Sequence, residues 1–255
     1  MFKTSILFQI CAHKTRIQAS WSNLIGMIHF HRVTLEYPRT KTKALYDINL
    51  EIRKGEFLFL VGHSGAGKSS LLSLLLKRLE PTAGAVYFAS ENLKALRGDR
   101  VAFHRRRIGV VFQDHRLLKD YTVEENLLFA LKVLGVPKAE AEIRLTRSLR
   151  TVGLSHKKRS YPEELSVGEA QRVALARAML GDPPVILADE PTGNLDPTNA
   201  LTVLEALKTA HARGSTVVVA THARELVEAY PQRVVVLKAG QIVRDEPAGG
   251  KFGLN

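Results

Sequence analysis

The stretch from Phe57 to Ser70 reads FLFLVGHSGAGKSS and decides the fold. Its apolar first part, 57–61, predicts a buried strand, and the leucine-rich residues after Ser70 predict a helix. Glycines between the two let the backbone approach phosphate oxygens where side chains would clash, and the helix N-terminus adds partial positive charge. Lys68 is expected to reach the β- and γ-phosphates of a nucleotide, and the Ser69 hydroxyl to bind Mg²⁺. The stretch therefore predicts a phosphate-binding loop with contacts from Gly62, His63, Ser64, Gly65, Ala66, Gly67, Lys68, Ser69 and Ser70.

The composition fits a globular domain. The chain has 255 residues, of which 45% are hydrophobic and 24% are charged, and this is enough for one domain with a full core. No apolar run approaches the roughly 20 residues that a membrane-spanning helix needs. The single cysteine, Cys11, excludes an internal disulfide and fits a reducing cytosol.

The formal net charge of +12 leaves nucleic-acid binding, an anionic membrane surface and simple solvation open as interpretations. Basic residues cluster at 105–107 and 156–159. Neither cluster is interleaved with aromatic residues as a base-stacking surface would be. We therefore expect a solvated basic face first, a membrane surface second, and no nucleic-acid partner.

Strands and helices alternate along most of the chain. Such alternation predicts an α/β fold with a mostly parallel sheet and helices on both faces. The segment from about 114 to 172 is rich in helix signals, including a capping box at Thr122 and Glu125, and predicts a helical subdomain. The predicted strands are 28–37, 44–52, 85–88, 108–112, 185–188, 216–220, 233–237 and 241–244; the main predicted helices are 70–76, 138–151, 168–180 and 197–213.

Residues 1–26 differ from the rest, because they carry basic residues and no acidic one. Their short apolar stretch at 6–12 leaves a signal peptide or an amphipathic surface anchor open. We prefer a third interpretation, an upstream start codon, with the folded domain spanning 27–255.

A second site follows the apolar strand at 185–188, which ends in Asp189 and Glu190. Open α/β sheets bind ligands at the carboxyl ends of their strands. Asp189 is expected to hold Mg²⁺ directly or through water, and Glu190 to accept a proton from the attacking water. One carboxylate for the metal and one for the base suits phosphoryl transfer.

A third motif, Leu165-Ser166-Val167-Gly168-Glu169, makes a family resemblance specific. In order, the chain carries the glycine-rich loop, Gln113 at a strand end, this LSxGE motif, Asp189-Glu190 and Thr221-His222. This order resembles the ATP-binding cassette (ABC) ATPases over nearly all of the chain from Met27 on. The resemblance implies a P-loop NTPase fold with a mostly parallel core, an N-terminal antiparallel β part and a helical subdomain.

The resemblance also implies roles for single residues. Tyr37 resembles the aromatic residue that stacks on adenine, and Gln113 the glutamine that contacts Mg²⁺ and water and senses a membrane partner. Ser166 and Gly168 resemble the signature residues that hold the γ-phosphate bound to an opposite subunit. The family therefore implies a dimer of two copies with ATP sandwiched between them. Asp196 resembles a residue of the loop that crosses the dimer interface, and His222 the switch histidine at the γ-phosphate.

Within the family, the motif at 188–196 is similar to a subgroup whose partners transmit force across a membrane. The stretches 62–69 and 112–118 look most like its cell-division members. Those ATPases pair with the membrane protein FtsX at the cytoplasmic face of the bacterial inner membrane, with contacts to the division machinery. Lipoprotein-releasing and macrolide-exporting ATPases of the same subgroup remain an alternative. So do a soluble cassette acting on DNA or ribosomes, and a non-hydrolysing scaffold.

Two positions depart from the family pattern. Val167 stands where the signature usually has glycine, and valine would be strained there if the position needs a positive φ. From that strain we expect slower closure of the dimer or slower hydrolysis of ATP. Ala223 replaces the usual acidic residue after the switch histidine.

Overall fold

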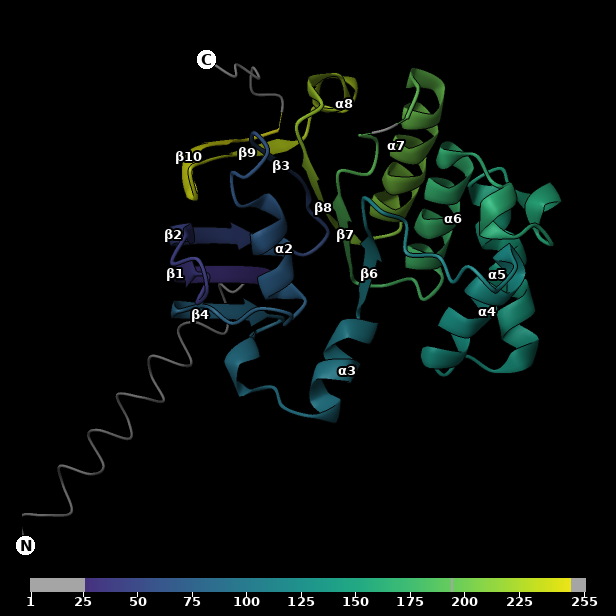
Figure 1. Cartoon of the computed structure of the whole chain (residues 1–255), viewed down its shortest axis with the longest axis horizontal. Helices are drawn as coiled ribbons and strands as arrows, with labels where there is room; N and C mark the ends of the chain where they lie inside the picture. Colours follow the sequence, from purple (N-terminus) through teal and green to yellow (C-terminus); the bar gives the residue numbers. More distant parts are fainter. Residues whose placement is uncertain (1–25, 194, 249–255) are drawn as a thin grey trace, which may run out of the picture.

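The computed structural model describes residues 26–193 and 195–248, and they build two sheets with helices packed between and beside them (Figure 1). The larger sheet has six strands in the order β10-β9-β3-β8-β7-β6. Its strands are parallel except for β10, which runs antiparallel to β9. The strands are β3 (Phe57–Val61), β6 (Ile108–Val111), β7 (Val185–Asp189), β8 (Thr216–Thr221), β9 (Arg233–Lys238) and β10 (Gln241–Glu246).

The smaller sheet is antiparallel and has the order β2-β1-β4-β5. Its strands are β1 (Ile28–Glu36), β2 (Lys43–Ile52), β4 (Ala83–Phe88) and β5 (Glu91–Asn92). The helices are α2 (Lys68–Leu75), α3 (Asp99–Arg106), α4 (Val123–Val133), α5 (Lys138–Thr151), α6 (Val167–Met179), α7 (Pro197–Ala212) and α8 (Arg224–Ala229). Helix α2 lies between the smaller sheet and the larger one, and α4 and α5 lie at the opposite end of the molecule, beyond α6 (Figure 1).

Strand β3 is the centre of the packing because it is buried on both faces. Phe57, Phe59 and Val61 belong to the core that β3 shares with α4 to α7. Leu58 and Leu60 point the other way, into the core shared with α2 and the smaller sheet. A continuous apolar run is what a parallel strand covered on both faces requires. The predicted α/β fold with a parallel core, an antiparallel N-terminal part and helices is confirmed.

The carboxyl ends of four neighbouring strands meet at one edge of the larger sheet. Val61 pairs with Thr221, Ala220 with Asp189, and Ala188 with Val111. The residues that follow these strands are therefore set side by side, in the order of the sheet. This edge brings together the glycine-rich loop, His222, Glu190 and Gln113.

The structure confirms several predicted elements and contains others that were not predicted, among them β5 and α3. Helix α5 has the predicted bounds, and Thr122 and Glu125 form the predicted capping box of α4. Helix α3 was not predicted, because its sequence is strongly polar and only His104 of it is buried. The boundaries of a helical subdomain at about 114–172 stay a prediction. The interpretations of residues 1–25 lie outside the described residues. Within residues 26–193 and 195–248, no helix is long and apolar enough to cross a bilayer.

Candidate ATP site

The glycine-rich loop packs between β9 and β2, and two of its glycines have no room for a side chain. A Cβ at Gly62 would lie 2.4 Å from the carbonyl oxygen of Leu237 in β9. Gly67, with φ of 108°, caps α2, and a Cβ there would lie 2.7 Å from the carbonyl oxygen of Ala44 in β2. The loop is thus fixed by the strands on either side of it, with α2 beginning directly behind it.

Lys68 is buried at the centre of the loop. Its Nζ donates to the carbonyl oxygens of Gly62 at 2.6 Å and His63 at 3.3 Å. The same ammonium lies 3.2 Å from Oε1 of Glu190, and the two side chains are 6% and 12% exposed. A buried cation at the N-terminus of a helix is well placed to attract phosphate.

Glu190 connects Lys68 to His222. Its second carboxylate oxygen lies 3.0 Å from Nδ1 of His222 and accepts the backbone N–H of His222 at 3.3 Å. The backbone of Glu190 is left-handed, with φ of 47°, and its N–H donates to the carbonyl oxygen of Ala220 at 2.8 Å. A non-glycine residue in this conformation is strained and often functional. The conformation turns the carboxylate away from β7 and toward the loop.

Asp189 presents a carboxylate oxygen without a partner. Oδ1 is buried and accepts no hydrogen bond from any residue that the structure describes. Burial raises the pKa of this carboxyl group, and a hydrogen bond with Ser69 opposes the rise. An uncompensated buried carboxylate oxygen beside a hydroxyl is a fitting pair of ligands for a hard cation that takes its remaining ligands from phosphate and water. The residues present therefore fit Mg²⁺.

Gln113 lies in the exposed turn after β6 and reaches the same region as Asp189. Both residues, with Val167 and the turn 114–116, line a cavity of 650 Å³. Gln113 is thereby brought to the metal-ligand side of the site, although no hydrogen bond of its side chain is seen among the described residues.

Tyr37 follows β1, and its hydroxyl oxygen lies 2.9 Å from the hydroxyl of Ser70 in the first turn of α2. The ring is partly buried and packs against the core that β3 shares with α2 and the smaller sheet. It therefore stands at the helix end of the glycine-rich loop. Stacking of this ring on adenine stays a prediction.

Ser166, Gly168 and Asp196 sit at the N-termini of two adjacent helices. Ser166 caps α6 in a capping box with Glu169, and Asp196 caps α7 by accepting from the N–H of Asn199. A Cβ at Gly168 would lie 2.8 Å from the side chain of Asn199, so the two helix ends are in close contact. Asn199 was not predicted as a site residue. The available signal was its position three residues after Asp196, where its N–H can donate to the side chain that caps α7.

These helix ends are not joined to the glycine-rich loop within one chain. No hydrogen bond or ion pair among residues 26–193 and 195–248 links Ser166 or Gly168 to residues 62–69. The predicted site residues thus fall into two groups, one around Lys68 and Glu190 and one around Ser166. The start of α6 still borders the first group, because Val167 lines the cavity with Gln113 and Asp189.

The expectation of strain at Val167 is wrong. Val167 is the first residue of α6 and is absent from the residues with positive φ. Its side chain is 52% exposed, so it neither strains the helix nor needs space in the core.

We therefore expect Val167→Gly to change ATP turnover by less than about twofold. Glycine costs at most about 1 kcal/mol in a helix and relieves no strain here. A steady-state phosphate-release assay checks this, with the thermal unfolding midpoint measured in parallel. A severalfold rise in turnover would show that valine does obstruct the site.

Comparison with known proteins identifies the family. The family model described as ABC transporter matches residues 45–193, from β2 to just past the Asp189-Glu190 pair. The chain belongs to the ABC transporter family. The cassette is 47% identical to the cell division ATP-binding protein FtsE of Mycobacterium tuberculosis, over 88% of this chain and 97% of that protein. It is 43% identical to FtsE of Bacillus subtilis, with the same coverage. With FtsE of Escherichia coli it shares 39% identity over 85% of this chain and 97% of that protein.

Solved structures agree with the cassette fold. The dimeric structure of the ABC transporter cassette MJ0796 superposes with a TM-score of 0.82 at 35% identity, covering 88% of this chain and 100% of that one. A second dimeric structure of MJ0796, in a post-hydrolysis state bound to ADP and Pi, has a TM-score of 0.81 at 34% identity and the same coverage. The predicted membership in the ABC ATPases, with similarity to FtsE, is confirmed.

Proposed function

We propose that this cassette is the ATP-binding and ATP-hydrolysing subunit of a membrane ABC complex that acts in bacterial cell division. The observation that carries the proposal is the chain of contacts from Lys68 through Glu190 to His222, at the sheet edge where the glycine-rich loop ends. These contacts bring together a cation that can bind phosphate, a carboxylate that can act as a base, and a histidine.

Hydrolysis assigns each of these groups a task. The γ-phosphate of ATP competes for Lys68, which frees Oε1 of Glu190 to accept a proton from the attacking water. His222 holds the other carboxylate oxygen and so keeps the base oriented. Mg²⁺, held by Ser69, Asp189 and Gln113, would neutralise charge on the phosphates. Tyr37, beside the start of α2, is proposed to stack on the adenine.

A second copy of the chain completes the site. The capped N-terminus of α6 carries Ser166 and Gly168, and a helix N-terminus is a ready anion site. Because these residues stand apart from the chain's own loop, we propose that they bind the γ-phosphate held by the partner copy. The dimeric relatives support this arrangement. Asp196 then lies at the interface between the two copies.

The membrane partner is proposed to resemble FtsX, a four-helix protein with a large extracytoplasmic loop. The similarity to several FtsE proteins over most of the chain supports this choice over an exporter. The complex would sit at the cytoplasmic face of the inner membrane, and the domain would span 27–255 with a helical subdomain at about 114–172. Contacts with other division proteins would follow from the same complex.

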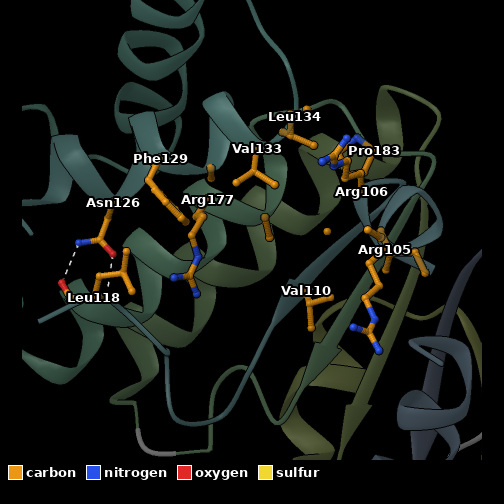
Figure 2. Close-up of a pocket in the computed structure, with 16 residues that line it drawn as sticks. Arg105, Arg106, Val110, Leu118, Asn126, Phe129, Val133, Leu134, Arg177 and Pro183 are labelled. Atoms are coloured by element: carbon orange, nitrogen blue, oxygen red, sulfur yellow. Dashed lines mark hydrogen bonds between the residues drawn. The ribbon is translucent and has the colours of Figure 1, made fainter. Parts of the chain in front are cut away.

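A groove on the surface fits such a partner (Figure 2). The groove has a volume of 490 Å³ and runs between α3 and β6 on one side and α4 and α6 on the other. Phe129 and Val133 of α4 expose 49% and 43% of their surface there. Arg105, Arg106 and Arg177 line the same groove, and none of the three forms an ion pair with a described residue. We propose that a cytoplasmic helix of the membrane partner, apolar on one face and carrying a carboxylate, docks there.

Replacing Phe129 with aspartate is expected to reduce co-purification with the membrane partner at least tenfold, because the charge enters the apolar wall of the groove. Ile143→Asp is the matched control, since Ile143 is 69% exposed on α5 and does not line the groove. Both variants are co-expressed with the FtsX-like protein and recovered through a tag on that protein. Equal recovery of the two variants would contradict docking in this groove.

A further inference from the structure

Arg177 joins the helix that carries the signature to the turn that carries Gln113. It projects from α6, and its two terminal nitrogens donate to the carbonyl oxygens of His115 and Arg116, each at 2.6 Å. Figure 2 shows the side chain reaching from its helix into the groove. A planar guanidinium can hold two acceptors at once in a fixed geometry, which an ammonium group cannot do.

The turn that Arg177 holds is strained. His115 and Arg116 have φ values of 53° and 52°, so two consecutive residues with side chains are left-handed. Each such residue costs of order 1 kcal/mol or more and persists only when its surroundings fix it. With both residues left-handed, both carbonyl oxygens are available to the same guanidinium. Arg177 is therefore a contact on which this backbone conformation depends.

The two ends of the turn are fixed in different ways. At the start, the contacts are local: the guanidinium of Arg116 lies 4.0 Å from the centre of the Phe112 ring and pairs with Asp114. At the end, Asn126 of α4 accepts from the N–H of Leu118 and donates to its carbonyl oxygen. Arg177 of α6 contacts the turn between these two attachments.

The segment from Phe112 to Leu118 contributes residues to both cavities, and Arg177 lines one of them. On one side, Arg177, Leu118 and Asn126 line the groove described above. On the other side, Gln113 and Asp189 line the cavity at the metal-ligand side of the site. Burial lowers the pKa of Arg177, and the side chain has no carboxylate partner among the described residues. A carboxylate arriving in the groove would compete with the two carbonyl oxygens for this guanidinium.

We propose that Arg177 is a positioning residue that transmits occupancy of the groove to Gln113. With the groove empty, Arg177 holds the turn in its left-handed form and so sets where Gln113 stands relative to Asp189. A carboxylate in the groove draws the guanidinium away and releases the turn. The inference has two parts. The holding half, that Arg177 fixes the turn, does not depend on a partner. The coupling half, that occupancy of the groove is transmitted to Gln113, rests on the proposed docking of a membrane partner.

The holding half is tested on the cassette alone by hydrogen exchange. Arg177→Gln and Arg177→Lys are compared with Arg150→Gln, a control on the exposed face of α5. Backbone amides of 115–118 are expected to exchange at least tenfold faster in Arg177→Gln, and to a lesser degree in Arg177→Lys. Amides of 62–69 are expected to stay within twofold of the parent. Unchanged exchange in the turn in both Arg177 variants would overturn the proposal.

The coupling half is tested by kinetics with the membrane partner reconstituted in nanodiscs. In Arg177→Gln, kcat is expected to fall about tenfold with KM for ATP within twofold, because the glycine-rich loop is untouched. Partner-dependent change in kcat is expected to vanish in both Arg177 variants and to persist in Arg150→Gln. A general loss of folding would instead lower the unfolding midpoint and affect KM as well. If the partner still changes kcat in both Arg177→Lys and Arg177→Gln, the coupling role is wrong. If the partner does not change kcat of the parent cassette, the docking proposal fails, while the exchange result still stands.

Discussion

Glu190→Gln is expected to lower steady-state ATP turnover by about 10²- to 10⁴-fold, the usual contribution of a general base. Glutamine keeps the shape of the side chain and can still contact Lys68 and His222. It cannot take a proton from water, so the nucleotide is bound and not cleaved. ATP affinity is therefore expected to stay at or above the parent level. Phosphate release under saturating ATP and equilibrium binding of ATP measure the two quantities separately.

The control for this substitution is Glu225→Gln, which removes one exposed carboxylate from the first turn of α8. It lies three residues after His222 and forms no ion pair with a described residue. Its turnover is expected to remain within about twofold of the parent. Turnover of Glu190→Gln at the parent rate would show that another group activates the water.

Lys68→Ala is the second large effect, and it acts on binding. The ammonium is buried and hydrogen-bonded inside the loop, where phosphate would take over its contacts. Removing one member of a buried charged pair costs about 2–5 kcal/mol, which corresponds to an affinity loss of roughly 30- to 5,000-fold. Titration calorimetry with ADP measures the loss directly, because ADP is not consumed.

Lys54→Ala is the control for charge, since Lys54 is exposed in the turn before β3. Its ADP affinity is expected to be unchanged within about twofold. Lys68→Ala also leaves Glu190 without its cation, so the unfolding midpoint is recorded to separate lost binding from lost folding. A folded Lys68→Ala cassette with the parent affinity for ADP would exclude the loop as the phosphate site.

The sequence predicted those elements whose signals lie within a few consecutive residues. The apolar run 57–61, the glycines after it and the capping box at Thr122 each reside in a few consecutive residues, and each predicted its element. Helix α3 gave no such signal, because it packs mainly through His104 and leaves Phe103 exposed. Val167 was misjudged because its backbone is set by the start of α6 and not by a turn.

Contacts between distant residues could not be predicted. Arg177 lies more than sixty positions from the two carbonyl oxygens that it holds. The bridge made by Glu190 joins Lys68 from one strand-helix turn to His222 from another, and it depends on a left-handed backbone at Glu190. Motif order placed these residues in one family pattern, but only the fold shows which of them touch. The separation of Ser166 from the loop is likewise a property of the fold.

That separation leads to the central claim, that two copies share each ATP site. The most direct measurement is the mass of the Glu190→Gln cassette by light scattering, with and without Mg²⁺ and ATP. Two further changes are added in that background. Ser166→Asp and Ser166→Asn both preserve a helix cap, but aspartate brings a negative charge to the position proposed to meet the γ-phosphate. We predict a dimer with ATP for Glu190→Gln and for its Ser166→Asn form, and a monomer for its Ser166→Asp form. Equal dimerisation of the Asp and Asn forms, or a mass that does not respond to ATP in any of them, would contradict the shared site.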